Sequence, residues 1–145
     1  MSKHVEVKKM KVEDAAAMAA KQAFSYIGSE MTPAQIAAIE ACEHAYSIFI
    51  DGTLKMVAGV TTYWPGRGEA WAILDPQCKT DFMELHHVVK RFLDICPVKR
   101  IEAAVECEFT PGHRWVKSLG FELEAKKLRA FLPDGKDASL YARVS

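Results

Sequence analysis

Strict alternation of apolar and polar residues marks several segments of this chain as β-strands. Residues 99–107 give the clearest case, because every second side chain of an extended strand points to the same side. The apolar side consists of Ile101, Ala103, Val105 and Cys107. The other side consists of Arg100, Glu102, Ala104 and Glu106. The pattern predicts a strand with one buried and one polar face.

Two β-rich segments, 46–50 and 53–64, are joined by Asp51-Gly52. This dipeptide is the strongest short-range signal for a hairpin, because both turn positions need a positive φ. Alternation predicts further strands around Val5 and Val7 and at 69–74, 121–132 and 138–144. Lys126-Lys127 interrupts the alternation within 121–132, which indicates a β-bulge.

A period of three to four residues marks the helices. The clearest one begins at Phe82 and is closed by Pro97, and Thr80 or Asp81 is expected to cap it. Its apolar stripe consists of Phe82, Leu85, Val89, Phe92 and Cys96. The other predicted helices are the alanine-rich segment 13–24, a helix that begins at Thr32-Pro33, and one from Thr110-Pro111 to Gly120.

The predicted order of elements is therefore β-α-α-β-β-β-α-β-α-β-β. The strand–helix–strand unit from Glu69 to Cys107 is long enough for a right-handed crossover, so its two strands should be parallel neighbours. The rest of the sheet can be antiparallel. The fold class is α/β, with a mixed sheet of α+β character built around a central parallel pair of strands.

Composition narrows the range of functions. A chain of 145 residues, half of them hydrophobic, predicts one domain spanning 1–145 that folds without disulfides or metals. A net charge of zero gives no electrostatic reason to expect nucleic-acid binding, and it leaves a homo-oligomer open. No apolar run is long enough for a membrane span. The widely spaced cysteines are expected to be reduced thiols, and the expected location is cytoplasmic.

The most specific motif is Arg114-Trp115-Val116-Lys117-Ser118-Leu119-Gly120-Phe121, followed by a hairpin that ends in Ser139-Leu140-Tyr141-Ala142. Together with the predicted order of elements, this motif resembles the GNAT superfamily of N-acetyltransferases over nearly the whole chain. The resemblance implies the GNAT fold. It also implies an acyltransferase that uses acetyl-CoA, or another acyl-CoA, to modify an amine acceptor whose identity the sequence does not give.

A narrower resemblance is to the GNAT-like proteins of phages and prophages, including an internal virion protein type. It rests on the general similarity of residues 69–74, 91–94 and 100–105 to those proteins. It implies an alternative function, a catalytically inactive protein whose partners are other virion proteins. Such a protein would be found in the cytoplasm of a bacterial host or packaged in a phage particle.

By the GNAT resemblance, the cofactor would bind between the parallel strands and at the start of the following helix. The cofactor-binding residues would be Leu74, Lys79, Thr80, Asp81 and Phe82. This loop lacks the glycines that let backbone N–H groups approach a pyrophosphate, and the carboxylate of Asp81 would oppose one. Glu69 matches the position of a general base in some GNAT enzymes. The alternative is that Glu69 is only an exposed residue near the start of a strand.

Other residues are weaker candidates for a catalytic or metal-binding role. Val116 occupies the position where many GNAT enzymes have a tyrosine that protonates the leaving thiolate, and His113 is the nearest substitute. His86 and His87 point about 100° apart on a helix, so they do not converge on a metal, and no metal site is expected. Cys107 with His113 could form a nucleophile and its base, but a core thiol is the preferred interpretation.

Overall fold

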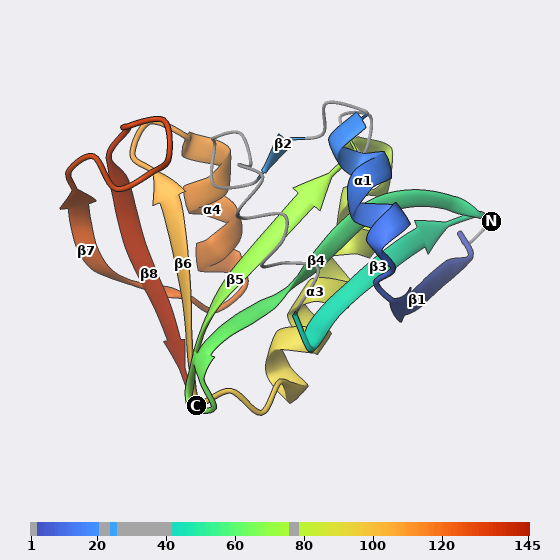
Figure 1. Ribbon diagram of the computed structural model, residues 1–145, viewed down its shortest axis with the longest axis horizontal. Coiled ribbons are helices and arrows are strands. Elements are labelled where there is room, and N and C mark those ends of the chain that lie inside the picture. The colour runs from blue at the N-terminus through green and yellow to red at the C-terminus, as the bar shows by residue number, and fades with distance from the viewer. Residues whose placement is uncertain (1–2, 21–23, 26–41, 76–78) are drawn as a thin grey trace.

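The computed structural model of the chain describes residues 3–20, 24–25, 42–75 and 79–145. Seven strands form one mixed sheet in the order β1-β3-β4-β5-β6-β8-β7, and a short strand, β2, pairs with β5 (Figure 1). The strands are β1 (Val5–Lys9), β2 (Phe24–Ser25), β3 (His44–Ile50), β4 (Thr53–Trp64), β5 (Arg67–Leu74), β6 (Arg100–Glu106), β7 (Glu122–Leu128) and β8 (Ala138–Val144). The helices are α1 (Val12–Ala20), the 3-10 turn η1 (Lys79–Asp81), α3 (Phe82–Ile95) and α4 (Thr110–Ser118).

The helices lie on opposite faces of the sheet. Helix α1 covers one face, where Met18 packs against Leu54, Val57 and Ile73. Helices α3 and α4 cover the other face and pack on strand residues to form the main core. That core includes Leu85, Val89, Leu93, Trp115 and Val116. No helix in the described part of the chain is long and apolar enough to cross a membrane.

Strands β5 and β6 are parallel neighbours, as the crossover length predicts. The mixed α/β class with a central parallel pair is therefore confirmed. The Asp51-Gly52 turn is also confirmed, with φ of 50° and 83°. Register shifts between Leu123 and Leu128 confirm the bulge at Lys126-Lys127. The predicted helix that begins at Thr32-Pro33 lies outside the described residues.

The first helix is shorter than predicted. It ends at Ala20, and Phe24 and Ser25 instead form strand β2, which pairs with Leu74 and Ile73 of β5. The physical reason is that β6 leaves β5 at this point, and the exposed edge of β5 needs hydrogen-bond partners. The last hairpin also departs from expectation, since β7 ends at Leu128 and not at residue 132.

Strand β6 is buried on both faces, which corrects the expected polar face. Residues 101–105 are all buried. Ala104 packs on Leu132, Ala138 and Leu140, and Glu102 lies beneath two arginines. The alternation concealed this because an alanine and an ion-paired glutamate both look compatible with a solvated face.

Candidate active site

The most distinctive feature of the sheet is a gap between β5 and β6. The two strands pair only at Arg67–Arg100, Gly68–Ile101 and Glu69–Glu102. Beyond Glu69 they separate, and β2 takes the same edge of β5 only at Ile73 and Leu74. Strand β4 occupies the other edge of β5 almost throughout. Residues 70–72 therefore present a strand edge that no neighbouring strand of the described chain covers.

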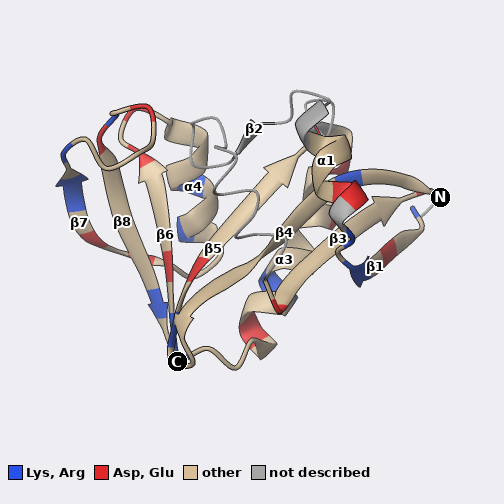
Figure 2. Ribbon diagram, viewed as in Figure 1, with Lys and Arg blue, Asp and Glu red and all other residues tan. Residues whose placement is uncertain are grey.

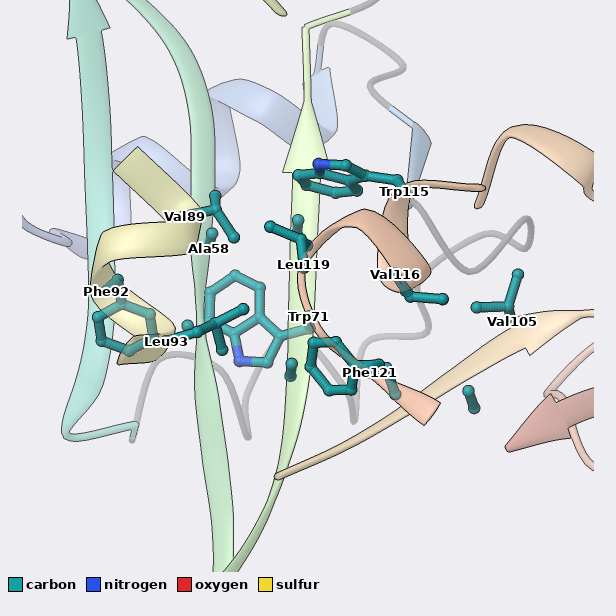
Figure 3. Close-up of a pocket in the computed structure, with 15 residues that line it drawn as sticks. Ala58, Trp71, Val89, Phe92, Leu93, Val105, Trp115, Val116, Leu119 and Phe121 are labelled. Atoms are coloured by element: carbon teal, nitrogen blue, oxygen red, sulfur yellow. The ribbon is translucent and has the colours of Figure 1, made fainter. Parts of the chain in front are cut away.

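A small apolar cavity lies over this gap on the face covered by α3 and α4 (Figure 3). Its volume is about 60 Å³. Small side chains of the sheet leave the space, among them Ala70, Ala72 and Ala103. The two helices close it with Val89, Leu93, Trp115, Val116 and others. The separation of β5 from β6, combined with three alanines, produces a cavity at the centre of the sheet.

Glu69, the predicted general base, is the last residue of β5 that pairs with β6. By the alternation of a strand it shares a face with Ile73, which is the face covered by α1. The Tyr63 hydroxyl donates a hydrogen bond of 2.7 Å to Oε2 of Glu69. Burial, followed by the hydrogen bond to Glu69, raises the pKa of Tyr63, so this hydroxyl keeps its proton. The half-buried carboxylate is thus held by a neighbour at the mouth of the gap.

Sequence reasoning missed Tyr63, although a signal for it existed. Thr61 pairs with Glu69 across the β4–β5 hairpin. Tyr63 follows two positions further along β4, at a register shift between Thr62 and Trp64. The hairpin therefore brings Tyr63 near Glu69, but the register shift itself is visible only in the structure.

The partner of Glu69 on β6, Glu102, is buried and neutralised by arginines. Arg67 binds it through two nitrogens, at 2.7 and 2.9 Å, and Nε of Arg100 lies 2.7 Å from Oε2. The Arg67 guanidinium is the main reason why the pKa of Glu102 lies below its usual value. Arg100 also binds Glu124. Figure 2 shows acidic and basic positions on β5, β6 and β8 near the end where these strands converge.

The two carboxylates, Glu69 and Glu102, differ in their ability to accept a proton because they have different partners. Glu102 is engaged by two guanidinium groups, so it is a poor proton acceptor. Glu69 is bound by a neutral hydroxyl. Of the two glutamates at the mouth of the gap, Glu69 is the one suited to accept a proton.

The structure places the predicted cofactor-binding residues at the far end of β5. Leu74 is fully buried at the end of that strand. Lys79, Thr80 and Asp81 form η1, and Phe82 begins α3. Glu69 is five residues away from Leu74 on an extended strand, or about 16 Å. The candidate base and the candidate cofactor loop thus lie at opposite ends of the open strand edge.

Asp81 occupies the N-cap position of α3, but its side chain makes no capping hydrogen bond. Its carboxylate instead lies 2.8 Å from the Lys3 ammonium and 3.5 Å from that of Lys55. The hydrogen bond from Lys3 lowers the pKa of Asp81, so the carboxylate stays charged. Two ammonium groups balance that charge, which weakens the repulsion that Asp81 would exert on a phosphate.

Helices α3 and α4 are bridged above the cavity. The Trp115 indole Nε1 donates a hydrogen bond of 3.1 Å to Nδ1 of His86. The ring centroids of Phe82 and Trp115 are 5.6 Å apart. Phe82, a predicted cofactor-loop residue, therefore contacts the aromatic residue of the segment that resembles GNAT enzymes.

This bridge requires an unprotonated Nδ1 on His86, which makes stability depend on pH. Burial, then the charges of His87 and Lys90, lower the pKa of His86. The unfolded chain therefore binds this proton first as pH falls. The stabilisation is complete above about pH 6.5 and is lost below it, by at most about 1.4 kcal/mol per pH unit.

We expect the His86→Gln variant to lose less stability than the wild type between pH 7 and pH 5, measured by denaturant unfolding. Equal pH dependence in the wild type and the His86 variant would contradict this role of His86.

The residue at the usual acid position, Val116, and its nearest substitute, His113, both lie on α4 and both have structural roles. Val116 is buried in the wall of the cavity. His113 accepts or donates at both ring nitrogens, with Nδ1 2.7 Å from the Tyr141 hydroxyl and Nε2 3.0 Å from the carbonyl oxygens of Glu106 and Cys107. Since the backbone carbonyls can only accept, Nε2 carries the proton and Nδ1 accepts from Tyr141. His113 thus contacts the backbone of Cys107, and the thiol lies near Ser139.

No family model matches the chain, and no curated protein matches it in sequence. Solved structures do match it in shape. Ard1 from Thermoplasma volcanium is 15% identical, with 97% of each chain covered and a TM-score of 0.77. The ribosomal-protein-S18-alanine N-acetyltransferase from Escherichia coli is 16% identical, with 97% of this chain and 94% of that chain covered and a TM-score of 0.71.

The structure of yncA from Salmonella typhimurium, which contains acetyl-CoA, is 15% identical, with 97% of this chain and 93% of that chain covered and a TM-score of 0.70. An acetyltransferase of the GNAT family from Bacillus anthracis matches at a TM-score of 0.67, with 14% identity and coverage of 99% and 97%. The similarity extends over nearly the full length of every chain. The protein therefore has the fold of the GNAT N-acetyltransferases.

Proposed function

We propose that this protein is an acyl-CoA-dependent N-acyltransferase that transfers an acetyl group to an amine. The observation that carries the proposal is the gap between β5 and β6, which begins at Glu69 and continues toward the start of α3. The open strand edge begins at the candidate base, Glu69, and borders the small cavity. The structural neighbours, several of which are named as N-acetyltransferases, support the same reaction class.

The residues along the gap suit the parts of acetyl-CoA. Backbone N–H groups at the start of α3, around Thr80, Asp81 and Phe82, would receive the pyrophosphate, with Lys79 in the same turn. The open edge at residues 70–72 offers backbone groups to the amides of the extended arm. The cavity of about 60 Å³ is far smaller than a whole cofactor site and is sized for a short acyl group.

Acetyl-CoA, when bound, supplies the acetyl group as a reactive thioester. Glu69 would accept the proton that the attacking amine loses as the new C–N bond forms and the C–S bond breaks. The Tyr63 hydroxyl holds Oε2 of Glu69, so Oε1 is the atom that receives this proton. Since Val116 has no proton to donate, the thiolate would take its proton from water.

Calorimetric titration of the purified protein with CoA and acetyl-CoA tests the proposal. We expect saturable binding of both, and release of free thiol when acetyl-CoA is mixed with an acceptor amine. ATP is the matched control ligand, because it carries phosphates but no pantetheine arm and should bind much more weakly. Absence of CoA binding at millimolar concentration would overturn the proposal.

The second candidate is a catalytically inactive GNAT-like protein of a phage particle. One observation favours it, namely that the usual acid position is filled by the buried side chain of Val116. The narrower phage and virion interpretation has no support from the structural neighbours and stays a prediction from sequence texture. Mass spectrometry of purified particles would test it, and turnover of acetyl-CoA would argue against it.

A further inference from the structure

Strand β1 forms one edge of the sheet, and its outer side has no neighbouring strand in the described part of the chain (Figure 1). It pairs with β3 in one continuous register over its five residues. Strand β7 forms the other edge and has two register shifts, the second of which spans Lys126 and Lys127. Bulges and lysines keep an edge from pairing with another chain. The regular edge of β1 is therefore the better suited of the two to accept a further strand.

The backbone of β1 offers hydrogen-bonding groups on its outer side at alternate residues. Just beyond its two ends, Met10 donates to the carbonyl oxygen of Ala45, and the carbonyl oxygen of His4 accepts from Asp51. Even-numbered residues therefore bond toward β3, because the bonding groups of an antiparallel strand alternate between its two sides. The residues whose N–H and C=O groups point outward are Val5, Val7 and Lys9.

The face of β1 on the α1 side carries two opposite charges. Glu6 pairs with Phe49, which belongs to the apolar cluster beneath α1, so Glu6 and Lys8 lie on that face. Both side chains reach solvent, and Nζ of Lys8 lies 3.4 Å from Oε2 of Glu6. A second copy of the chain, paired antiparallel with the first and centred on Val7, would place its Lys8 directly opposite Glu6. By symmetry the same pair forms twice, so this edge is complementary in charge to itself.

A centre at Val7 suits both the charges and the hydrogen bonds. Centring on Glu6, Lys8 or Lys9 would set that residue opposite its own copy, and like charges directly opposite each other are destabilising. Centring on Val5 would leave Lys8 without a carboxylate opposite it. With Val7 at the centre, its outward N–H and C=O groups bond to those of the second Val7, and those of Val5 bond to Lys9.

The other face of β1 adds apolar surface. Val7 is 49% exposed and lines a groove of about 380 Å³ together with residues of β3 and α3, among them Tyr46 and Phe92. Ile95, at the end of α3, is 74% exposed and lines the same groove. A second copy centred on Val7 brings its own Val7 beside the first. It therefore buries apolar surface on the α3 side while it pairs charges on the α1 side.

We propose that β1 is the interface of a homodimer, in which two copies of this chain pair antiparallel about a two-fold axis at Val7 and join their sheets into one. Such an interface uses the same residues on both copies, as two-fold symmetry requires. The inference goes beyond the proposed function and does not rest on it, because β3 and β4 separate β1 from β5 and from the gap.

Sedimentation velocity of the full-length protein at increasing concentration tests this interface. We expect the wild type to form dimers. Glu6→Lys and Lys8→Glu should each weaken dimerisation by about tenfold or more, because each sets like charges opposite each other at two symmetric positions. The two variants mixed together should dimerise with each other, because the first then carries two basic and the second two acidic side chains on this face.

Glu122→Lys makes the same change of charge at an exposed position of the other edge strand, so it is the matched control and should dimerise like the wild type. Amide hydrogen exchange supplies a second readout. As the protein concentration rises, exchange at the outward N–H of Val7 should slow severalfold. Exchange at Glu6, whose N–H points toward β3, should stay unchanged.

The outcomes decide for or against β1. A wild type that stays monomeric at about 1 mM would overturn the proposal. A dimer that neither charge reversal weakens would also overturn it, because that dimer would use another face. Dimers that are lost in each variant alone and restored in their mixture would support pairing at β1.

Discussion

Replacement of Gly59 by alanine is expected to lower the free energy of unfolding by about 3 kcal/mol or more. The new Cβ would lie 2.2 Å from the carbonyl oxygen of His44 and 2.9 Å from Cα of Ala45. Both atoms belong to the backbone of β3, so no side chain can rotate to relieve the overlap. Relief requires that β3 and β4 move apart where Ala45 pairs with Gly59.

Denaturant unfolding of Gly59→Ala measures this effect. Gly66→Ala is the matched control, because nothing lies within 4 Å of a Cβ at Gly66. It should change stability by no more than about 0.5 kcal/mol. A Gly59→Ala protein with the unfolding midpoint of the wild type would show that β3 and β4 adapt freely there. The same variant should displace the indole of Trp71, because the new Cβ would lie 2.9 Å from its Cζ2 atom.

Elements with a local cause were predictable from the sequence. The Asp51-Gly52 turn follows from the two residues that tolerate positive φ, and both adopt it. Helix α3 follows from a stripe of apolar residues, of which Leu85 and Val89 are buried, and Leu93, outside that stripe, is buried as well. The parallel pairing of β5 with β6 follows from the length and handedness of the connection.

Features with a distant cause were not predictable in this way. Strand β2 forms because β6 leaves β5 open, and nothing in Phe24-Ser25 itself shows this. Asp81 engages Lys3, 78 residues away, and this contact redirects a side chain expected to cap α3. Glu102 is buried because two arginines of the adjacent strand starts converge on it. Local patterns specify elements, whereas ion pairs between strands become visible only once the strand order is known.

In the candidate site, too, the sequence predicted some features and only the structure shows others. The sequence placed Glu69 at the start of the strand before the cofactor loop and gave it a role through resemblance alone, and the structure adds that it borders the gap. It also distinguishes Glu69 from Glu102, which a sequence shows only as two glutamates on two strands. The difference lies in their partners, a tyrosine hydroxyl for one and two guanidinium groups for the other.

If the proposed function is correct, Glu69→Gln should lower kcat by about a hundredfold or more, since general-base catalysis contributes on the order of 10²–10⁴. Glutamine keeps the size of the side chain and can still accept the hydrogen bond from Tyr63, so the fold and CoA binding should be unchanged.

Steady-state kinetics, together with calorimetric CoA binding, check this prediction. Glu122→Gln at an exposed position of β7 is the matched control and should keep the wild-type rate. Tyr63→Phe should fall between the two, with a loss of about tenfold, because it frees the carboxylate without removing it. A Glu69→Gln protein that binds CoA and turns over at the wild-type rate would show that the amine loses its proton to water or to another group. In that case Glu69 would serve only to hold Tyr63 at the mouth of the gap.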